Sequence, residues 1–237
     1  MARFRTQLIK RENPCDQTIA FHFAKPRGFE FRPGQYVDVA LIEPPEMDSE
    51  GPVRTFSIAS APYEDGLLVA TRMRTSTFKK FLATAPIGTE VQLEGPAGSF
   101  TLHKNQAKPA VFLAGGIGIT PFRSILRQAA HDKDPRRLAL FYGNSRPRRT
   151  AFLPDLEALA ETNPRFQFVP LMAAADDGWK GPVGLIEPAV LKRYFPDLHG
   201  PIYYVAGPPE MVGGVRQALV SAGIDEDDIR SEEFGGY

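Results

Sequence analysis

The pattern of apolar residues changes once along the chain, near residue 105, and this change restricts the possible folds more than any other feature. Before it, short runs rich in β-branched and aromatic residues alternate with Pro-Gly and Asp-Gly turns, which is typical of antiparallel strands. After it, apolar strands alternate with amphipathic helical stretches, which is typical of a parallel sheet covered by helices. The sequence therefore predicts two domains, residues 1–105 and 106–237, joined within the polar stretch 103–108.

The first half is expected to form a closed antiparallel β-barrel, because closure removes exposed strand edges. Its six predicted strands are 4–10, 18–23, 35–42, 53–60, 67–73 and 90–94. One helix is predicted at 77–83, where Thr75 and Ser76 can accept hydrogen bonds from the free amides of its first turn. A helix start of this kind favours an anion.

The second half is expected to be an α/β domain with a parallel sheet. The predicted strands are 110–114, 138–142, 166–171 and 202–206. The predicted helices are 121–130, 151–162, 188–194 and 209–222.

The composition excludes several functions. Lysine plus arginine and aspartate plus glutamate both total 28, so there is no basic excess for nucleic acid or an anionic membrane. Cys15 is the only cysteine, so this chain supplies no iron–sulfur cluster, and its four histidines do not have metal-ligand spacing. No apolar run approaches the roughly 18 to 20 residues of a membrane span. We expect a soluble, cytoplasmic protein without a metal site.

Residues 110–121 (AVFLAGGIGITP) predict a strand, a glycine-rich turn and a helix start. Gly116, Ile117 and Gly118 form the turn, Thr120 is the expected cap, and Pro121 is the expected first helical residue. Backbone amides in such a turn approach a pyrophosphate closely, and the helix dipole favours the same group. The alternative is a tight turn without a ligand, because Pro121 replaces the third glycine of the common dinucleotide-binding pattern.

The second strand of this half ends in FYGNSRPRR, residues 141–149, and contains no acid. Dinucleotide-binding domains specific for NAD place an acid near this point for the ribose hydroxyl. Asn144, Ser145 and Arg146 instead suit a 2′-phosphate, because a guanidinium matches phosphate geometry. This favours NADPH over NADH; the alternative is a solvated basic loop.

Six segments, taken together and in order, resemble the ferredoxin–NADP reductase superfamily, which joins an FAD-binding barrel to a nucleotide-binding α/β domain. They are FRPGQYV (31–37), RTFS (54–57), GPAGSF (95–100), GGIGITP (115–121), GPPEM (207–211) and EEF (232–234). The resemblance covers nearly the whole chain and implies FAD together with NADPH or NADH.

In the barrel, the resemblance implies that Arg54 clamps the FAD pyrophosphate, that Phe56 lies against the flavin ring and that Ser57 hydrogen-bonds near flavin N5. These roles suit a guanidinium fork, an aromatic face and a hydroxyl. Without that context, the same residues also fit a plain strand with Phe56 in the core. The remaining FAD contacts implied are Thr55, the segment of Thr71, Arg72, Met73 and Arg74 along the ribityl chain, and Ser76 with Thr77 at a second phosphate contact.

In the second domain, the resemblance assigns Gly116, Ile117, Gly118, Thr120 and Pro121 to the nucleotide pyrophosphate site. It places Gly207, Pro208 and Met211 beside the nicotinamide, and the aromatic residues Phe234 and Tyr237 near the flavin face. Tyr237 is alternatively a frayed terminus. Ser57 with Glu232 or Glu233 would assist proton movement, and the alternative for both carboxylates is a surface charge.

Four departures from the family pattern stand out. Phe56 replaces a common tyrosine, and Ala206 replaces a cysteine that many relatives place near the hydride path. The approach to the second phosphate contact is shortened to residues 75–77, with the serine register falling near Phe78, and the iron–sulfur domain fused in some relatives is not expected.

The function implied is hydride transfer from NAD(P)H to FAD, followed by electron transfer to a separate flavodoxin, ferredoxin or oxygenase component. Candidate docking charges for an acidic carrier are Lys79, Lys80, Arg136 and Arg137. One alternative is a reductase of a small-molecule acceptor, such as free flavin or a ferric chelate. Another is a non-catalytic, FAD-binding regulatory module, which Ala206 favours.

Overall fold

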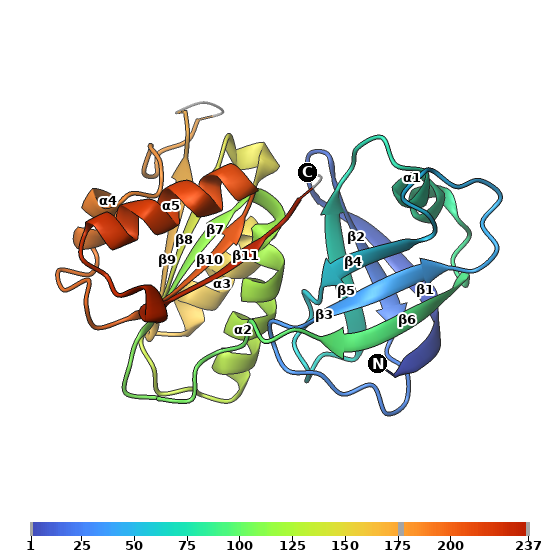
Figure 1. Cartoon of the computed structure of the whole chain (residues 1–237), viewed down its shortest axis with the longest axis horizontal. Helices are drawn as coiled ribbons and strands as arrows, with labels where there is room; N and C mark the ends of the chain where they lie inside the picture. Colours follow the sequence, from blue (N-terminus) through green and yellow to red (C-terminus); the bar gives the residue numbers. More distant parts are fainter. Residues whose placement is uncertain (1, 175–177, 236–237) are drawn as a thin grey trace. The chain divides into compact units, whose positions relative to one another are not determined.

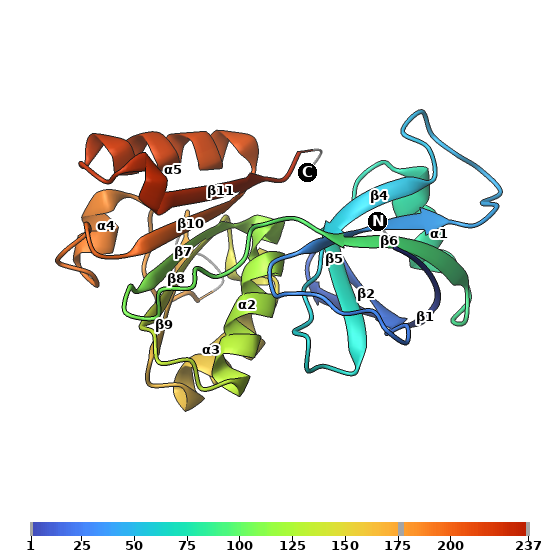
Figure 2. The same cartoon turned by 60° about the horizontal axis from the view of Figure 1, so that its bottom comes forward.

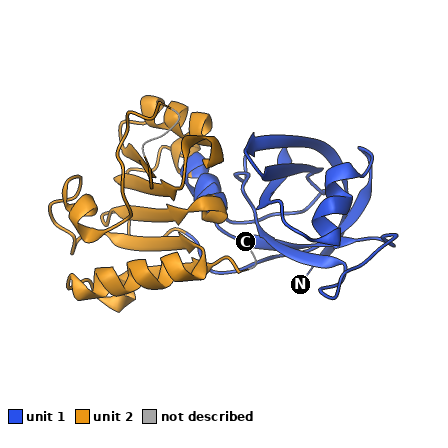
Figure 3. Cartoon of the chain, turned by 90° about the horizontal axis from the view of Figure 1, so that it is seen from above, with its two compact units in different colours: residues 1–101, 120–128 blue, residues 102–119, 129–237 orange. Residues whose placement is uncertain are grey.

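The computed structural model describes residues 2–174 and 178–235 (Figure 1). Two compact units are present, coloured separately in Figure 3. The barrel unit comprises residues 1–101 and 120–128, and the sheet unit comprises residues 102–119 and 129–237. Among the described residues, no helix combines the length and the apolar composition needed to cross a bilayer.

The barrel unit contains a curled antiparallel sheet in the order β4-β3-β6-β1-β2-β5, which confirms the predicted architecture (Figure 1). Its strands are β1 (Arg3–Cys15), β2 (Thr18–Ala24), β3 (Tyr36–Leu41), β4 (Val53–Ser57), β5 (Gly66–Arg72) and β6 (Glu90–Ala97). Helix α1 (Thr77–Thr84) follows β5, and the Ser76 hydroxyl accepts from the Lys79 amide at 3.4 Å, as expected for a cap.

The predicted closure of the barrel is only partly realised. The outer strands β4 and β5 form no ladder with each other in the described part of the chain. Instead the Ala59 amide donates to the Leu68 carbonyl at 2.7 Å, and the Ser60 hydroxyl accepts from the Leu68 amide at 3.0 Å. Because β4 ends at Ser57, three residues earlier than expected, these bonds join an irregular segment to β5 and replace regular pairing.

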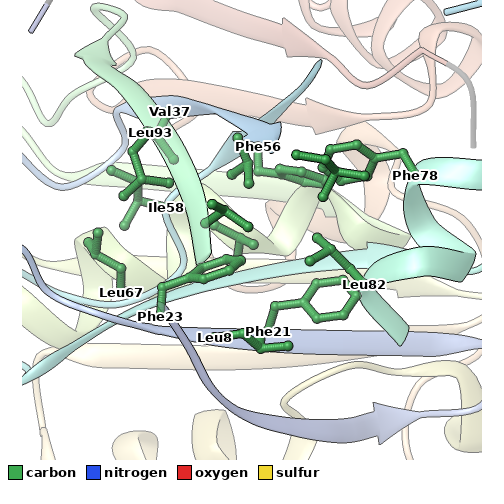
Figure 4. Packing of buried hydrophobic residues seen from close by; sticks show 14 of the residues in the cluster. Leu8, Phe21, Phe23, Val37, Phe56, Ile58, Leu67, Phe78, Leu82 and Leu93 are labelled. Carbon is green, nitrogen blue, oxygen red and sulfur yellow. The ribbon is translucent and has the colours of Figure 1, made fainter. Parts of the chain in front are cut away.

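The core of the barrel unit is formed by apolar side chains from its strands and from α1 (Figure 4). Phe21 and Phe23 of β2 are fully buried, and Phe78 and Leu82 of α1 pack against the same cluster. The apolar face of α1 therefore anchors the helix to the sheet and fixes where its N-terminus lies.

The sheet unit contains five parallel strands in the order β11-β10-β7-β8-β9. They are β7 (Ala110–Gly115), β8 (Leu138–Asn144), β9 (Phe166–Met172), β10 (Ile202–Gly207) and β11 (Ile229–Glu233). The first four confirm the prediction. Strand β11 was not predicted, because its sequence IRSEE contains one buried apolar residue, Ile229, and lacks a strand-like apolar pattern.

Helices cover both faces of this sheet. Helices α4 (Pro188–Lys192) and α5 (Pro209–Ser221) lie on one face, and α3 (Leu153–Thr162) lies on the other (Figure 2). Val212, Val215 and Leu219 of α5 join the core beneath β7 and β10. The predicted α/β class is confirmed.

Helix α2 (Ile119–His131) starts earlier than predicted. A 3-10 turn, Gly116–Gly118, leads directly into it, so no separate cap residue stands between the glycine segment and the helix. Thr120 therefore lies inside the helix and is not its cap, and Pro121 is the third helical residue and not the first. Proline is still tolerated there, because amides of the first turn have no partner within the helix.

A buried polar network holds the segment before β7 against the sheet unit. The Tyr204 hydroxyl accepts from the His103 backbone amide at 2.8 Å and lies 3.0 Å from His103 Nδ1. His103 Nε2 lies 3.0 Å from the Lys108 carbonyl, so the neutral ring with a proton on Nε2 satisfies both contacts. Burial lowers the pKa of His103, and the nearby Arg136 and Arg230 charges act in the same direction.

We predict that this network makes the stability of the sheet unit depend on pH. Unfolded His103 takes up a proton near pH 6.5, whereas the folded ring takes it up only at lower pH. The unfolded state therefore binds more protons in this window, and the free energy of unfolding falls as the pH drops below 6.5. The slope from one proton is at most about 1.4 kcal/mol per pH unit.

Urea unfolding followed by circular dichroism at several pH values measures this effect. His103→Gln should remove part of the acid sensitivity, whereas His131→Gln, at an exposed ring, should retain it. Equal acid sensitivity in wild type and His103→Gln would contradict the assignment.

Candidate functional site

The Arg54 guanidinium in the barrel unit is held by the loop that precedes β4. Its Nη1 donates to the carbonyls of Gly51 and Val53, both at 2.8 Å, and of Glu50 at 3.2 Å. Its Nη2 lies 2.8 Å from Asp48 Oδ1 and 2.9 Å from Glu50 Oε2. The guanidinium also lies over the Phe78 ring at 5.4 Å, so α1 and β4 together fix its position.

Asp48 joins Arg54 to the start of α1. Its Oδ2 accepts from the Thr77 backbone amide at 3.0 Å, while its Oδ1 accepts from Arg54. The Arg54 guanidinium, with both the hydroxyl and the amide of Thr77, lowers the pKa of Asp48 to about 2. One carboxylate thus occupies the point toward which a guanidinium and a helix N-terminus both direct positive charge.

The other residues of the RTFS segment divide between core and surface. Phe56 is 3% exposed and packs against Phe78, with ring centroids 5.9 Å apart (Figure 4). Thr55 is exposed, and its hydroxyl donates to Asp38. Ser57 is buried. Contact of these residues with a flavin stays a prediction, and the buried Phe56 ring already packs against Phe78.

The segment after Thr71 turns from the interior to the surface. The Thr71 side chain is fully buried, and the Arg72 guanidinium donates to the Asp16 carbonyl at 3.1 Å. Met73 is half-buried and Arg74 is exposed. Arg74 is therefore the member of this segment placed to meet a ligand from solvent.

Lys79 and Arg136 do not fit their predicted docking role, because both are buried. Lys79 is 7% exposed and its Nζ donates to the Arg72 carbonyl at 3.1 Å; burial and the Arg54 and Arg74 charges lower its pKa. Arg136 is 7% exposed and paired with Asp134 at 2.6 Å. Lys80 and Arg137 are exposed, although Arg137 packs on Phe195, and their docking role stays a prediction.

In the sheet unit, the glycine turn lies at the carboxyl ends of β7 and β10. Gly116 has φ +53°, and its carbonyl accepts from the Tyr142 hydroxyl at 2.8 Å. A Cβ at Gly118 would lie 2.3 Å from the Ala206 carbonyl oxygen, so this glycine is required by packing between backbones. Ile117, Thr120 and Pro121 are buried.

The end of β8 carries a buried amide without a partner. Asn144 is 9% exposed, and neither its Nδ2 nor its Oδ1 forms a hydrogen bond with the described residues. Ser145 and Arg146 follow it and are exposed. An unpaired buried amide is costly, and this one lies at the carboxyl edge of the sheet; its contact with a nucleotide stays a prediction.

The remaining predicted residues lie at the end of the same sheet. Gly207 ends β10, Pro208 is exposed and caps α5, and Met211 is half-buried in its first turn. Glu232 and Glu233 pair in parallel register with Ala206 and Gly207, and the Phe234 amide donates to the Gly207 carbonyl at 2.9 Å. Tyr237 lies outside the described residues.

Sequence reasoning missed Asp48. It lies in EPPEMDSEG, residues 43–51, a loop without apolar periodicity or a motif that would mark one of its four acids. Only the folded conformation of the loop distinguishes Asp48 from the other three acids. No group of three or more histidine, cysteine, aspartate or glutamate side chains in the described ranges is arranged to hold a metal.

The chain is similar in sequence to known oxidoreductases. Residues 112–217 match the oxidoreductase NAD-binding domain family. The chain is 28% identical to the reductase component of propane 2-monooxygenase from Rhodococcus jostii, covering 97% of this chain and 63% of that protein. It is 32% identical to the phenol 2-monooxygenase reductase component from Pseudomonas sp. strain CF600, covering 90% and 60%. The chain thus spans about three fifths of the length of these curated relatives.

A solved structure shares the whole two-domain fold. The ferredoxin NADP+ reductase from Neisseria gonorrhoeae, determined with bound FAD and NADP, matches with a TM-score of 0.81 at 23% identity, covering 98% of this chain and 99% of that one. The fold predicted from the six segments is therefore confirmed.

The packing around Gly118 gives a testable prediction. Gly118→Ala should destabilise the sheet unit by about 1–3 kcal/mol or more, because the new methyl group collides with backbone that cannot move aside. Gly214→Ala is the matched control, since nothing lies within 4 Å of its added Cβ and alanine favours the interior of α5 by up to about 1 kcal/mol. Urea denaturation compares them, and a Gly118→Ala protein as stable as wild type would refute the packing argument.

Proposed function

We propose that this chain, a member of the ferredoxin–NADP reductase superfamily, is the NAD(P)H-oxidising flavoprotein part of an electron-transfer system. The observation that carries the proposal is that each unit holds its own set of donors suited to an anionic nucleotide. In the barrel unit these are Arg54 and the Thr77 amide; in the sheet unit they are the glycine turn and the buried Asn144 amide.

The barrel donors fit the diphosphate of FAD. Arg54 and the Thr77 amide already hold two oxygens of one carboxylate, as they would hold two oxygens of a phosphate. The buried Lys79, close enough to Arg54 and Arg74 for their charges to lower its pKa, adds positive charge behind them. Arg54, Ser76, Thr77 and Arg74 would hold the cofactor through its phosphates.

The sheet donors fit a nicotinamide nucleotide. The carboxyl edge of a parallel sheet is where such folds bind nucleotides, and the matched NAD-binding domain family covers this region. Gly116 and the start of α2 would meet the pyrophosphate, and Asn144 would find its missing partner in the ligand. Ser145 and Arg146, with no acid between residues 141 and 149, support NADPH as the preferred donor.

FAD, when bound, accepts hydride and releases electrons, while the chain supplies binding and orientation. Ser57 has a hydroxyl able to donate or accept beside a ring nitrogen. Glu232 and Glu233, at the sheet edge next to Ala206 and Gly207, are the carboxylates available for proton movement.

The proposed electron acceptor is an oxygenase component or a small electron carrier that serves one. This rests on the names of the relatives, which are reductase components of propane and phenol monooxygenases. The chain spans about three fifths of the length of those proteins, and a direct assay with candidate acceptor proteins tests this part of the proposal.

Anaerobic stopped-flow mixing of FAD-loaded protein with NADPH and with NADH tests the function. The flavin absorption should bleach in a single turnover, and reoxidation should be accelerated by an acceptor protein. Bound FAD that is not reduced by either nucleotide would leave only a non-catalytic FAD-binding role, and protein that binds no FAD would refute the proposal.

Arg146→Ala tests the preference for NADPH. Losing one charge-assisted contact of about 1.5–3 kcal/mol should raise KM for NADPH about tenfold to hundredfold and leave KM for NADH nearly unchanged. Arg148→Ala, an exposed arginine in the next turn, is the control. An equal rise in KM for both nucleotides would show that Arg146 does not recognise the 2′-phosphate.

A further inference from the structure

The loop between β3 and β4 bonds to Arg54 through the Glu50 and Gly51 carbonyls, and one acidic side chain joins it to α1. Most of residues 43–50 are exposed, and Met47 leaves 62% of its surface in solvent, so the loop buries little apolar area. Asp48, by contrast, bonds both to Arg54 and to the first residue of α1.

Asp48 accepts hydrogen bonds from the donors that would otherwise bind a phosphate. Its Oδ1 accepts from Arg54 Nη2 at 2.8 Å and from the Glu50 amide at 3.1 Å, and its Oδ2 accepts from the Thr77 amide at 3.0 Å. A diphosphate at Arg54 and Thr77 requires the same donors. The carboxylate and a phosphate oxygen cannot occupy one position, and their like charges repel each other.

The surrounding charge favours the diphosphate over the carboxylate. Arg54 is 13% exposed at its side chain, Lys79 is buried, and Arg74 is near enough to act on Lys79. Glu50, the second acid paired with Arg54, leaves 71% of its side chain exposed and is therefore well screened by solvent. A ligand with two negative charges compensates this cationic site better than Asp48 does.

We propose that Asp48 is an intramolecular competitor for the flavin diphosphate: it closes the site in the cofactor-free chain, and it must leave Arg54 and Thr77 when FAD binds. This inference rests on the proposed function and adds a residue that sets cofactor affinity. Binding of FAD then releases Asp48 and the mostly exposed residues 43–49, whereas the Glu50 and Gly51 carbonyls keep their bonds to Arg54 Nη1.

The test uses the cofactor-free 237-residue chain and measures FAD affinity by isothermal titration calorimetry. Asp48→Asn keeps the shape of the side chain but removes its charge, so FAD should bind about tenfold or more tightly, the scale of one lost charge-assisted bond. Inorganic pyrophosphate should likewise bind more tightly. Glu46→Gln removes one charge from an exposed residue of the same loop and should leave both affinities close to wild type.

Hydrogen exchange on the wild-type chain supplies an independent measure that needs no variant. Adding FAD should increase amide exchange across residues 43–49 while the Thr77 amide stays protected by its new partner. Unchanged or weaker FAD binding by Asp48→Asn, or a loop whose exchange does not respond to FAD, would overturn the proposal. If neither wild type nor variant binds FAD, the proposed function itself fails, which is a separate result.

Discussion

Arg54 and the first amide of α1 direct positive charge to the same point, and the folded chain keeps an anion there. The strand β4 presents the guanidinium, and the apolar face of α1 packs into the barrel core so that its N-terminus meets that guanidinium. Asp48 completes the arrangement with a carboxylate whose pKa is held at about 2, so it stays ionised throughout the physiological range. A site that is built around an anion in this way is suited to a phosphate.

In the sheet unit, the candidate site for an anion is formed mainly by backbone groups of the glycine turn. Gly118 has no side chain, so the glycine turn packs directly against the Ala206 backbone at the end of β10 and then runs into α2. Packing alone thus explains the glycine at position 118, whereas the buried Asn144 amide has no hydrogen-bond partner among the described residues. The proposed nucleotide contact at Asn144 therefore rests on a separate observation from the glycine pattern.

Much of the fold could be predicted because apolar periodicity reports burial directly. Strands such as β2 and β7, and helix α1 with its Ser76 cap, follow from that signal. Strand β11 could not be predicted, because an edge strand with one buried residue has almost no apolar pattern. The burial of Lys79 and Arg136 was also missed. The sequence around a charged residue does not show whether the fold supplies a carbonyl or an acid as its buried partner. Of the candidate site, Arg54 and the start of α1 were found from motif and capping signals, but Asp48 depends on a loop conformation that only tertiary contacts define.

A crystal structure of the chain with FAD tests the central claim most directly. The account predicts that the diphosphate accepts hydrogen bonds from Arg54 and the Thr77 amide, and that Asp48 has moved away from both. A diphosphate bound elsewhere, with the Arg54–Asp48 ion pair intact, would contradict it.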